Sequence, residues 1–421
     1  MTLRVLHLVH QFPPDYAGGT ELYTQMLARG QAARGYSVAI FCPSPGAADQ
    51  ASAPIPHIED GVRVYRAAIG KRSPVRVFLS TFVHSALDRA WRWTLDQEQP
   101  DLVHAQHLIG MPTSLIAQLN ARRIPYVVTL HDYWFFCANA QLLTNYSREV
   151  CSGPRRWINC GQCAVARAGH HRLMPLAPGL APLFAYRAIR LKGVLRGARA
   201  IIAPSDFVRN AHRRLGLPSN KIRVIPHGIS VPLQSAPRPA ARRESGPLRI
   251  AYIGGLALQK GAHVLLEAVN DLPLDAMRLS IYGDTDAYPE YVAQLQETAR
   301  HPGIEFRGRL PRADVWSALS ESDIIVIPSI WHETSSLVAQ EAFAAGVPVI
   351  ASRIGALPER VRDGVDGLLF PPGDADALRA VLLRLINDRD ALARLRHAIR
   401  PVRTIDDHVI EIEGVYAAIA A

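Results

Sequence analysis

Short apolar segments rich in β-branched residues alternate along the whole chain with longer stretches of helical spacing. Such alternation is typical of parallel sheets whose two faces are covered by helices. The strands predicted in the first half are Val5–Val9, Val38–Phe41, Val62–Tyr65, Leu102–His104, Tyr126–Leu130, Ala200–Ala203 and Arg223–Ile225. Those predicted in the second half are Leu248–Ile253, Arg278–Tyr282, Ile304–Phe306, Ile324–Ile327 and Val347–Ala351. The pattern therefore predicts an α/β protein with two doubly wound domains in tandem.

A proline-rich segment, VPLQSAPRPAARRESGP, separates the two halves and is typical of a linker. With 421 residues the chain also exceeds what one hydrophobic core usually serves. We expect an N-terminal Rossmann-like domain over residues 1–231, a linker over 232–247 and a C-terminal Rossmann-like domain over 248–400. A last helical segment, 401–421, is expected to pack back on the first domain. Since ligands of open α/β sheets bind beyond the carboxyl ends of the strands, we expect the ligand site in the cleft between the domains.

The composition is that of a soluble globular protein, with 48% hydrophobic and 20% charged residues and a mean hydropathy of +0.03. No apolar run approaches the ~20 residues that span a bilayer. The opening MTLRVLHLVHQFPP contains an arginine and has no small-residue cleavage site, so it indicates a first strand and not a signal peptide. We therefore expect a cytoplasmic protein.

Positive charge is concentrated between Cys151 and Arg214. This stretch has one acid, Asp206, so its net charge is +11, and its 12 basic residues are Arg155, Arg156, Arg167, Arg172, Arg187, Arg190, Lys192, Arg196, Arg199, Arg209, Arg213 and Arg214. One interpretation is a surface for an anionic partner, either phospholipid at the cytoplasmic face of a membrane or a pyrophosphate-linked acceptor. The other is a solvated helical face. No nucleic-acid-binding module accompanies the charge, so we expect no nucleic acid partner.

The densest group of candidate site residues follows the predicted strand Ile324–Ile327, where PSIWHETSSLVAQEAF places Glu333 and Glu341 eight positions apart. Ser335, Ser336 and Leu337 lie where a helix would begin, and free backbone N–H groups at a helix start can hold an anion. Eight helical residues rise about 12 Å, comparable with the reach of an extended nucleotide-sugar. The alternative is an ordinary amphipathic helix with two glutamates.

A second candidate is the glycine-rich turn after the strand Leu248–Ile253, with Gly254, Gly255, Lys260 and Gly261. Glycines allow close backbone approach, and a lysine there could neutralise phosphate charge. The spacing is not that of a P-loop, and an ordinary strand-to-helix turn would look the same.

Two candidates lie in the first half. Gly18, Gly19 and Glu21 stand at the entry to a helix, where a loop could approach a diphosphate or simply connect two elements. His131 and Asp132 come directly after a strand. His131 could donate to a sugar hydroxyl or to developing charge, while a packed core histidine is the alternative.

Taken together, these motifs resemble the retaining glycosyltransferases of glycosyltransferase family 4, over nearly the whole chain. The resemblance rests on Glu333 and Glu341 with EAFAAGVPVIAS, on Lys260–Gly261, on PHG at Pro226–Gly228, on Gly18–Gly19 and on His131 in TLHD. It implies a GT-B fold, a nucleotide-diphosphate sugar (UDP- or GDP-linked) bound by the C-terminal domain, and a glycan, lipid-linked or small-molecule acceptor bound by the N-terminal domain. It also implies a metal-independent reaction with no required cofactor.

The resemblance implies a role for each matching residue. Lys260 would bind the diphosphate, Glu341 the ribose hydroxyls and Glu333 the donor sugar, while His131 would reach that sugar from the other domain and Gly19 would lie against the phosphates. The family usually has arginine at the position of Gly255, and glycines at the positions of Thr334 and Ser336. These departures leave the identity of the donor open.

The mechanism that the resemblance implies is front-face displacement, in which the leaving phosphate takes the acceptor proton and catalysis consists of positioning and charge stabilisation. A nucleotide-sugar epimerase on the same scaffold is one alternative, and a non-catalytic module that binds sugar nucleotides is another. Consumption of donor without acceptor would indicate the first, and binding without transfer would indicate the second.

Four of the five cysteines fall in one window, Cys137, Cys151, Cys160 and Cys163. In a cytosolic protein such a group favours a thiolate metal site over disulfides, so a structural zinc is one interpretation and free thiols are the other. Asp284 and Asp286 spell the metal motif of another transferase fold, but we interpret them as a loop feature. Asp374 and Asp376 are interpreted as the start of a helix.

Overall fold

The computed structural model describes residues 3–16, 18–46, 53–217, 219–232 and 246–420. The chain divides into two compact units, one formed by residues 1–228 with 405–421 and the other by Ile229–Thr404. Each unit holds its own sheet and is described by itself. Most of the predicted linker, residues 233–245, lies outside the described residues.

The N-terminal unit is built on an eight-stranded sheet of order β3-β4-β2-β1-β5-β6-β7-β8. Its strands run parallel except for the antiparallel pair β3–β4 at one edge. The strands are β1 (Arg4–Leu8), β2 (Ser37–Ser44), β3 (Pro56–Glu59), β4 (Val62–Ala68), β5 (Leu102–Ala105), β6 (Tyr126–Thr129), β7 (Ala200–Ala203) and β8 (Ile222–Val224). The helices are α1 (Gly19–Ala33), α2 (Pro74–Leu79), α3 (Ser85–Glu98), α4 (Ser114–Ala121), α5 (Ile158–Arg167), the 3-10 helix η1 (His171–Leu180), α6 (Ala181–Gly197), α7 (Asp206–Arg214), the short η2 (Ser219–Lys221) and α15 (Ile405–Ala420).

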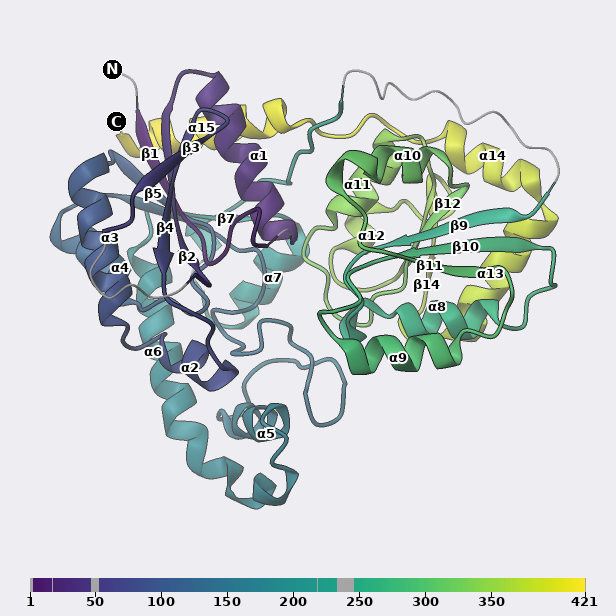
Figure 1. The fold of residues 1–421 in the computed structure, drawn as a ribbon, viewed down its shortest axis with the longest axis horizontal. Coiled ribbons are helices and arrows are strands. Elements are labelled where there is room, and N and C mark those ends of the chain that lie inside the picture. The colour runs from purple at the N-terminus through teal and green to yellow at the C-terminus, as the bar shows by residue number, and fades with distance from the viewer. Residues whose placement is uncertain (1–2, 17, 47–52, 218, 233–245, 421) are drawn as a thin grey trace. The chain divides into compact units, whose positions relative to one another are not determined.

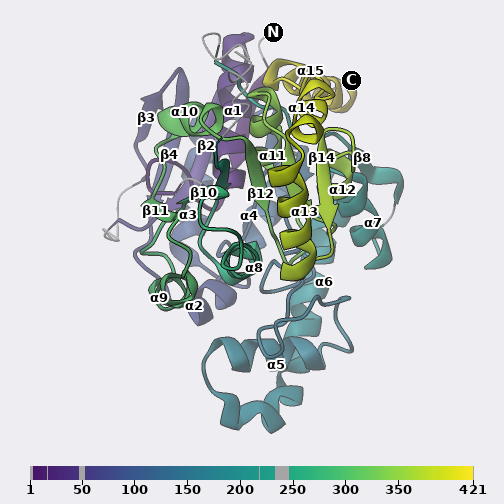
Figure 2. The same cartoon turned by 90° about the vertical axis from the view of Figure 1, so that its right-hand side faces the viewer.

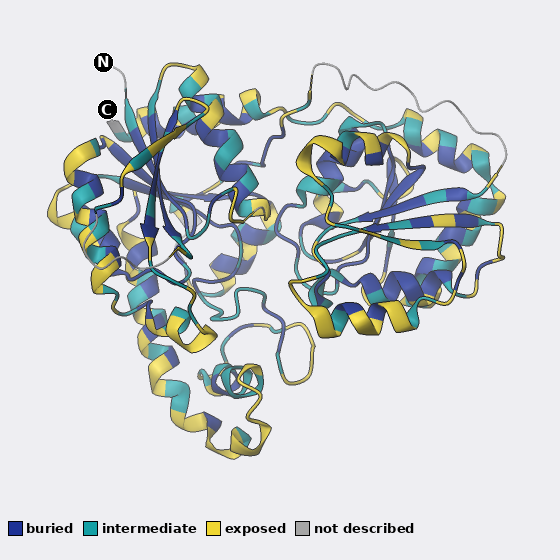
Figure 3. Ribbon diagram, in the orientation of Figure 1, coloured by how far each residue is buried: buried dark blue, intermediate teal, exposed yellow. Residues whose placement is uncertain are grey.

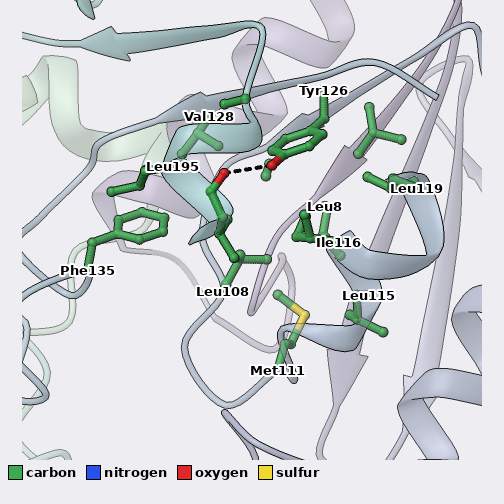
Figure 4. Close-up of a cluster of buried hydrophobic side chains, with 14 of the residues drawn as sticks. Leu8, Leu108, Met111, Leu115, Ile116, Leu119, Tyr126, Val128, Phe135 and Leu195 are labelled. Atoms are coloured by element: carbon green, nitrogen blue, oxygen red, sulfur yellow. Dashed lines mark hydrogen bonds between the residues drawn. The ribbon is translucent and has the colours of Figure 1, made fainter. Parts of the chain in front are cut away.

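Helices α1 and α15 pack on one face of this sheet, and α3, α4 and α6 pack on the other (Figure 1). On the second face, Leu115, Leu119 and Leu195 pack with the strand residues Leu8 and Val128 in an apolar core (Figure 4). Tyr126 is buried there, and its hydroxyl donates to the carbonyl of Val194 over 2.6 Å. The α5–η1 segment and the first turns of α6 extend from this unit as a separate lobe (Figures 1 and 2).

The C-terminal unit has a six-stranded, all-parallel sheet of order β11-β10-β9-β12-β13-β14. Its strands are β9 (Leu248–Ile253), β10 (Met277–Tyr282), β11 (Ile304–Gly308), β12 (Ile324–Ile327), β13 (Val349–Ser352) and β14 (Gly367–Phe370). Its helices are η4 (Leu258–Lys260), α8 (Ala262–Val269), α9 (Pro289–Thr298), η5 (Arg312–Asp314), α10 (Val315–Ser320), α11 (Leu337–Ala344), α12 (Leu357–Arg360), α13 (Ala375–Asn387) and α14 (Arg389–His397).

Two apolar clusters cover the two faces of this sheet. One contains residues of α8, α9, α13 and α14, and the other contains residues of α10, α11 and α12 (Figures 1 and 2). Strands β12 and β13 are buried along their length, whereas β10 and β11 alternate between more and less buried positions, and the outer faces of the helices are exposed (Figure 3). Burial on both faces explains why β12 (IIVI) and β13 (VIAS) are nearly continuous apolar runs, while the less buried β10 (MRLSIY) and β11 (IEFRG) carry polar residues at alternate positions. The predicted class of two doubly wound α/β domains is therefore confirmed.

Candidate active site

The candidate site of the C-terminal unit lies where the strand order of its sheet reverses. Strand β9 comes first in the sequence but lies in the middle of the sheet, with β10 on one side and β12 on the other. The loops that leave β9 and β12 therefore meet at the carboxyl edge, the usual place of ligand sites in such sheets. Lys260 belongs to the first loop and Glu333 to the second, and Lys260 Nζ lies 2.7 Å from Glu333 Oε1.

Two glycines make this meeting of loops possible. Gly261 has a φ of +73°, and a Cβ built there would lie 1.8 Å from the carbonyl oxygen of Pro328. Gly355 has a φ of +62°, and its Cβ would lie 2.4 Å from the backbone nitrogen of Glu333. Any side chain at either position would push apart the backbone segments that carry Lys260 and Glu333.

Glu333 is buried, and three donors converge on its Oε1 atom. Besides Lys260, the hydroxyl of Ser329 donates over 2.7 Å and the indole Nε1 of Trp331 over 2.9 Å. Burial alone would raise the pKa of Glu333, but the charge of Lys260 and these three hydrogen bonds lower it overall. The Lys260 ammonium also lies 5.0 Å from the ring centroid of Trp331. The carboxylate is therefore ionised and held in one orientation.

Helix α11 begins at Leu337, where the sequence predicted a helix start, with Ser336 as its N-cap. The Ser336 hydroxyl accepts from the backbone nitrogen of Ala339 over 3.3 Å. Glu341 lies on this helix and is buried, which raises the pKa of its carboxyl group. The guanidinium of Arg312 forms an ion pair with Glu341 Oε1 at 2.6 Å. Ser335 is buried beside the cap, and Arg360 Nη2 donates to its hydroxyl over 3.4 Å.

Arg312, Arg360 and Trp331 are contacts that sequence reasoning missed. Arg312 follows β11 in the basic segment RGRLPR, and that position after a strand is the signal that could have singled it out. Gly255, in contrast, carries no close neighbour: a Cβ built there has nothing within 4 Å. The turn at Gly255 is fixed by its carbonyl, which accepts from the Tyr252 hydroxyl over 2.8 Å.

In the N-terminal unit the predicted residues again follow the central strands. Gly18 is the N-cap of α1 and Gly19 its first residue. Glu21 in the first turn is buried, and its Oε1 lies 3.4 Å from His10 Nε2. Burial raises the pKa of Glu21.

His131 lies two residues beyond β6 and is buried. Its Nε2 lies 2.9 Å from the amide oxygen of Gln106, a residue that sequence reasoning missed. Burial lowers the pKa of His131 to about 3, so the ring is neutral near pH 7. The adjacent Asp132 accepts from His107 over 2.8 Å, and this contact outweighs burial and lowers the pKa of Asp132.

A chain of buried polar side chains connects His131 to helix α15. Gln106 Nε2 lies 3.0 Å from His7 Nδ1, whose Nε2 lies 2.8 Å from Gln31 Oε1. The amide of Gln31 in turn donates to the hydroxyl of Tyr416 on α15 over 3.2 Å. A satisfied network of this kind fixes the orientation of each ring in it, and here it fixes that of His131.

The four clustered cysteines lie in the N-terminal unit as free thiols. Burial, together with the charge that neighbouring thiolates would carry, raises the pKa of Cys160 to about 12 and that of Cys163 to about 11. Within the described part of the chain, no group of three His, Cys, Asp or Glu side chains is arranged to hold a metal ion. The structure therefore adds no support for zinc binding by Cys137, Cys151, Cys160 and Cys163, and both interpretations stay predictions.

Asp284 and Asp286 lie in the loop between β10 and α9, where the Asp284 carboxylate accepts from the backbone nitrogen of Asp286 over 2.9 Å. Their interpretation as a loop feature is confirmed. Asp374 is the N-cap of α13, as predicted, and its carboxylate accepts from the backbone nitrogen of Ala377.

The fold is that of the GT-B glycosyltransferases. The chain is similar to the solved structure of sucrose-phosphate synthase from Thermosynechococcus elongatus, with a TM-score of 0.76, 20% identity and 99% of each chain covered. It is also similar to the Anabaena protein HepE in complex with UDP and glucose, with a TM-score of 0.69, 18% identity, and coverage of 99% of this chain and 100% of that one. The predicted GT-B fold is thereby confirmed.

Sequence comparison defines the family. The profile described as Glycosyltransferase Family 4 matches residues 17–231, and the one described as Glycosyl transferases group 1 matches residues 247–388. This chain belongs to glycosyltransferase family 4 and is a glycosyltransferase.

Similar curated proteins span nearly the whole chain. Glycogen synthase of Mycobacterium tuberculosis is 26% identical, covering 96% of this chain and 91% of its own length. The D-inositol 3-phosphate glycosyltransferase of Xylanimonas cellulosilytica is 28% identical, covering 93% and 90%. The phosphatidyl-myo-inositol mannosyltransferase of Mycobacterium leprae is 27% identical, covering 96% and 94%. Among the described residues, no helix is long and apolar enough to cross a bilayer.

Proposed function

We propose that this glycosyltransferase moves a sugar from a UDP- or GDP-linked donor to an acceptor with retention of configuration and without a catalytic metal. The observation that carries the proposal is the pair Lys260–Glu333, held at 2.7 Å where the loops after β9 and β12 meet. A bound sugar diphosphate has an anionic end, the phosphates, and a neutral polar end, the sugar. An ammonium and a carboxylate that are fixed side by side can bind these two ends. The ammonium faces the phosphates and the carboxylate accepts from sugar hydroxyls.

The other residues take the roles that family membership suggests. Glu341, buried on α11 and paired with Arg312, accepts from the ribose hydroxyls. Ser335, Ser336 and Leu337 offer backbone N–H groups to the diphosphate at the start of α11. Gly18 and Gly19 have no side chains, so the diphosphate can also approach the backbone closely at the start of α1. His131 acts on the donor sugar as a neutral imidazole, since its pKa is lowered to about 3.

In the proposed step, the bond between the anomeric carbon and the diphosphate oxygen breaks while the acceptor hydroxyl oxygen bonds to the same face of that carbon. The acceptor proton passes to the leaving phosphate oxygen, so no separate general base is needed. The protein stabilises the charge that develops on the diphosphate, which is where Lys260 acts. The acceptor is a glycan, a lipid-linked molecule or a small molecule, the range that the names of the relatives cover.

We also propose that the basic stretch Cys151–Arg214 contacts an anionic membrane surface. Of the ion pairs that join two described residues, one involves a cation of this stretch, the local pair of Arg209 with Asp206. Arg155, Arg156, Arg172 and most of the other cations are exposed. Exposed cations without acidic partners are free to interact with anionic headgroups.

The experiment that tests the transferase proposal begins with a thermal-shift screen of UDP- and GDP-sugars, because a bound donor stabilises the fold by mass action. The donor found is then incubated with candidate acceptors, with and without EDTA, and the anomeric configuration of the product is read by NMR. We expect a retained configuration and a rate that EDTA leaves nearly intact. An inverted product, or a rate abolished by EDTA and restored by Mn²⁺ or Mg²⁺, would contradict the proposal.

A further inference from the structure

The N-terminal unit contains a cavity of about 810 Å³, partly open to solvent, whose lining includes the four clustered cysteines but none of the candidate donor-site residues. It lies between α2, the segment 134–145, α5, η1 and α6. These elements meet where the lobe of α5 and α6 joins the rest of this unit (Figure 1). The volume of the cavity falls within the range of ligand pockets, which is about 300–1,000 Å³. The cavity is therefore large enough to bury most of a small organic ligand.

The walls of this cavity are largely apolar. Phe78, Phe136, Leu142, Leu143 and Phe184 are among the residues that form them. Apolar side chains also continue onto the surface at its edge: Val75 is 59% exposed, Leu173 48% and Leu183 36%. Exposed apolar residues grouped around a pocket mark a site for an apolar ligand or a membrane.

Positive charge lines the same cavity without any acidic counterpart. Arg72, Arg167 and Arg187 are among its described lining residues, which include no Asp or Glu. None of these three arginines forms an ion pair with a carboxylate among the residues that the structure describes. Arg187 is only 2% exposed, and its Nε atom has no hydrogen-bond partner.

The contacts of Arg187 show how it is held. Its Nη2 donates to the Trp134 carbonyl over 2.8 Å, and its guanidinium lies 4.7 Å from the ring centroid of Trp134. Burial lowers the pKa of Arg187 to about 10, so the side chain keeps its charge near pH 7. A buried cation without a carboxylate is unfavourable by itself, because its desolvation is not offset by an opposite charge.

We propose that this cavity binds the hydrocarbon chain of a lipid-linked acceptor, with the phosphate group of that lipid facing Arg187 and Arg72. A neutral sugar has no charge for the arginines, and a free phosphate has no apolar group for the cavity walls. A phosphate on an apolar chain matches both the arginines and the walls. Burying the chain removes its apolar surface from water, which favours binding. The inference rests on the proposed transferase function and narrows its acceptor to a lipid phosphate.

The test measures the binding of farnesyl phosphate below its aggregation concentration, by calorimetry and thermal shift. Farnesol and inorganic phosphate serve as the two halves of this probe. Leu183→Asp and Val75→Asp place a charge at the edge of the cavity, each in the first turn of a helix, where an acid does not disturb the fold. The matched control is Ile58→Asp, since Ile58 is 77% exposed on β3 and does not line the cavity.

We expect farnesyl phosphate to bind the wild type and the Ile58→Asp protein equally, and at least tenfold more weakly to the two cavity variants. Arg187→Met should reduce the preference for farnesyl phosphate over farnesol, and Arg72→Gln provides the same readout if the buried substitution impairs folding. Equal binding to wild type and cavity variants would overturn the proposal. Binding only to vesicles containing phosphatidylglycerol, and not to monomeric farnesyl phosphate, would overturn it as well.

Donor binding is measured in the same preparations to separate this inference from the transferase proposal. The donor should stabilise the wild type and the Leu183→Asp protein alike, because Leu183 is not among the residues assigned to donor binding in either unit, which are Gly18, Gly19 and His131 in its own unit and Lys260 and Glu341 in the other. If farnesyl phosphate fails to bind while the donor still does, the lipid cavity is refuted and the transferase proposal stands. If the donor fails to bind, the transferase proposal is the one refuted.

Discussion

At the scale of single residues, the ammonium of Lys260 carries the proposed chemistry. Lys260→Ala should lower kcat/KM by about 10²-fold, because the charge that stabilises the departing diphosphate is lost. Steady-state kinetics with saturating acceptor measure this change. Arg307→Ala is the control, since it removes an exposed cation of the same unit that pairs with Glu305. A loss of less than threefold in the Lys260→Ala protein would refute the role of this lysine.

Gly255 offers a test in the opposite direction, because family members usually carry arginine there. A Cβ at this position has nothing within 4 Å and φ is not positive, so a longer side chain fits without strain. Gly255→Arg should therefore fold normally and lower the KM for the donor several-fold by adding a cation beside Lys260. Gly255→Gln supplies nearly the same length without the charge. If the glutamine variant behaves like the arginine variant, charge is not the cause.

At the scale of elements, the turn between η4 and α8 sets the position of Lys260. Gly261→Ala combines a positive φ with a Cβ 1.8 Å from the Pro328 carbonyl, so we expect a loss of stability of about 2 kcal/mol or more together with reduced activity. Gly373→Ala is a matched control, since its φ is +77° and its Cβ would meet nothing within 4 Å. It should cost about 1 kcal/mol and leave activity unchanged. Urea unfolding compares the stability of the two variants. Equal losses of stability would mean that the close contact between a Cβ at position 261 and the Pro328 carbonyl is unimportant.

Helices and strands were predictable from the sequence where residues adjacent in the sequence carry the signal. The central strands and the start of α11 at Leu337 agree with prediction because each is an apolar run or a cap that adjacent residues define. The strands β3 (Pro56–Glu59) and β14 (Gly367–Phe370) were missed, since four-residue segments at sheet edges carry little periodicity.

The candidate site was predictable only in part. Lys260 and Glu333 could be singled out because each follows a strand, although 73 positions separate them. The ion pair of Arg312 with Glu341 and the contact of His131 with Gln106 could not be, since neither sequence spacing nor composition indicates them. The network of His7, Gln31 and Tyr416 depends on helix α15, which is distant in sequence from the strands it covers.

At the scale of the whole molecule, the buried histidines predict acid sensitivity. Burial lowers the pKa of His7 and His212 to about 4 and that of His131 to about 3, and lowers those of His10 and His104 well below 6.5. Unfolding therefore takes up protons below the unfolded-state pKa of about 6.5, so stability is complete above it and falls as the pH drops toward 4. Each proton taken up on unfolding changes the free energy of unfolding by about 1.4 kcal/mol per pH unit.

This loss of stability should appear at a pH above the range in which the carboxylates become protonated. Urea unfolding between pH 7.5 and 4.5 measures the slope, and His212→Asn should reduce it by about one proton, since an amide can keep the bond from His212 to the Val208 carbonyl. A stability independent of pH over this window would contradict the assigned neutral state of these rings.

The charge of the Cys151–Arg214 stretch predicts behaviour of the whole protein toward membranes. Each basic side chain near an anionic leaflet contributes about 1 kcal/mol, less at high salt. The protein should sediment with vesicles containing phosphatidylglycerol at low salt and be released at high salt. Equal sedimentation with neutral and anionic vesicles, or none with either, would exclude a role of this charge in membrane contact.

Helix α15 has a consequence for the synthesis of the protein. Its buried residues Val409, Ile412 and Tyr416 complete the core of the N-terminal unit, yet residues 229–404 are translated before them. At roughly 5–20 residues per second, the ribosome needs roughly 10 to 35 s to make that intervening segment. During this interval the nascent N-terminal sheet exposes the apolar face that α15 later covers. The unit that begins first is thus finished last, and that uncovered face is where a chaperone would bind the growing chain.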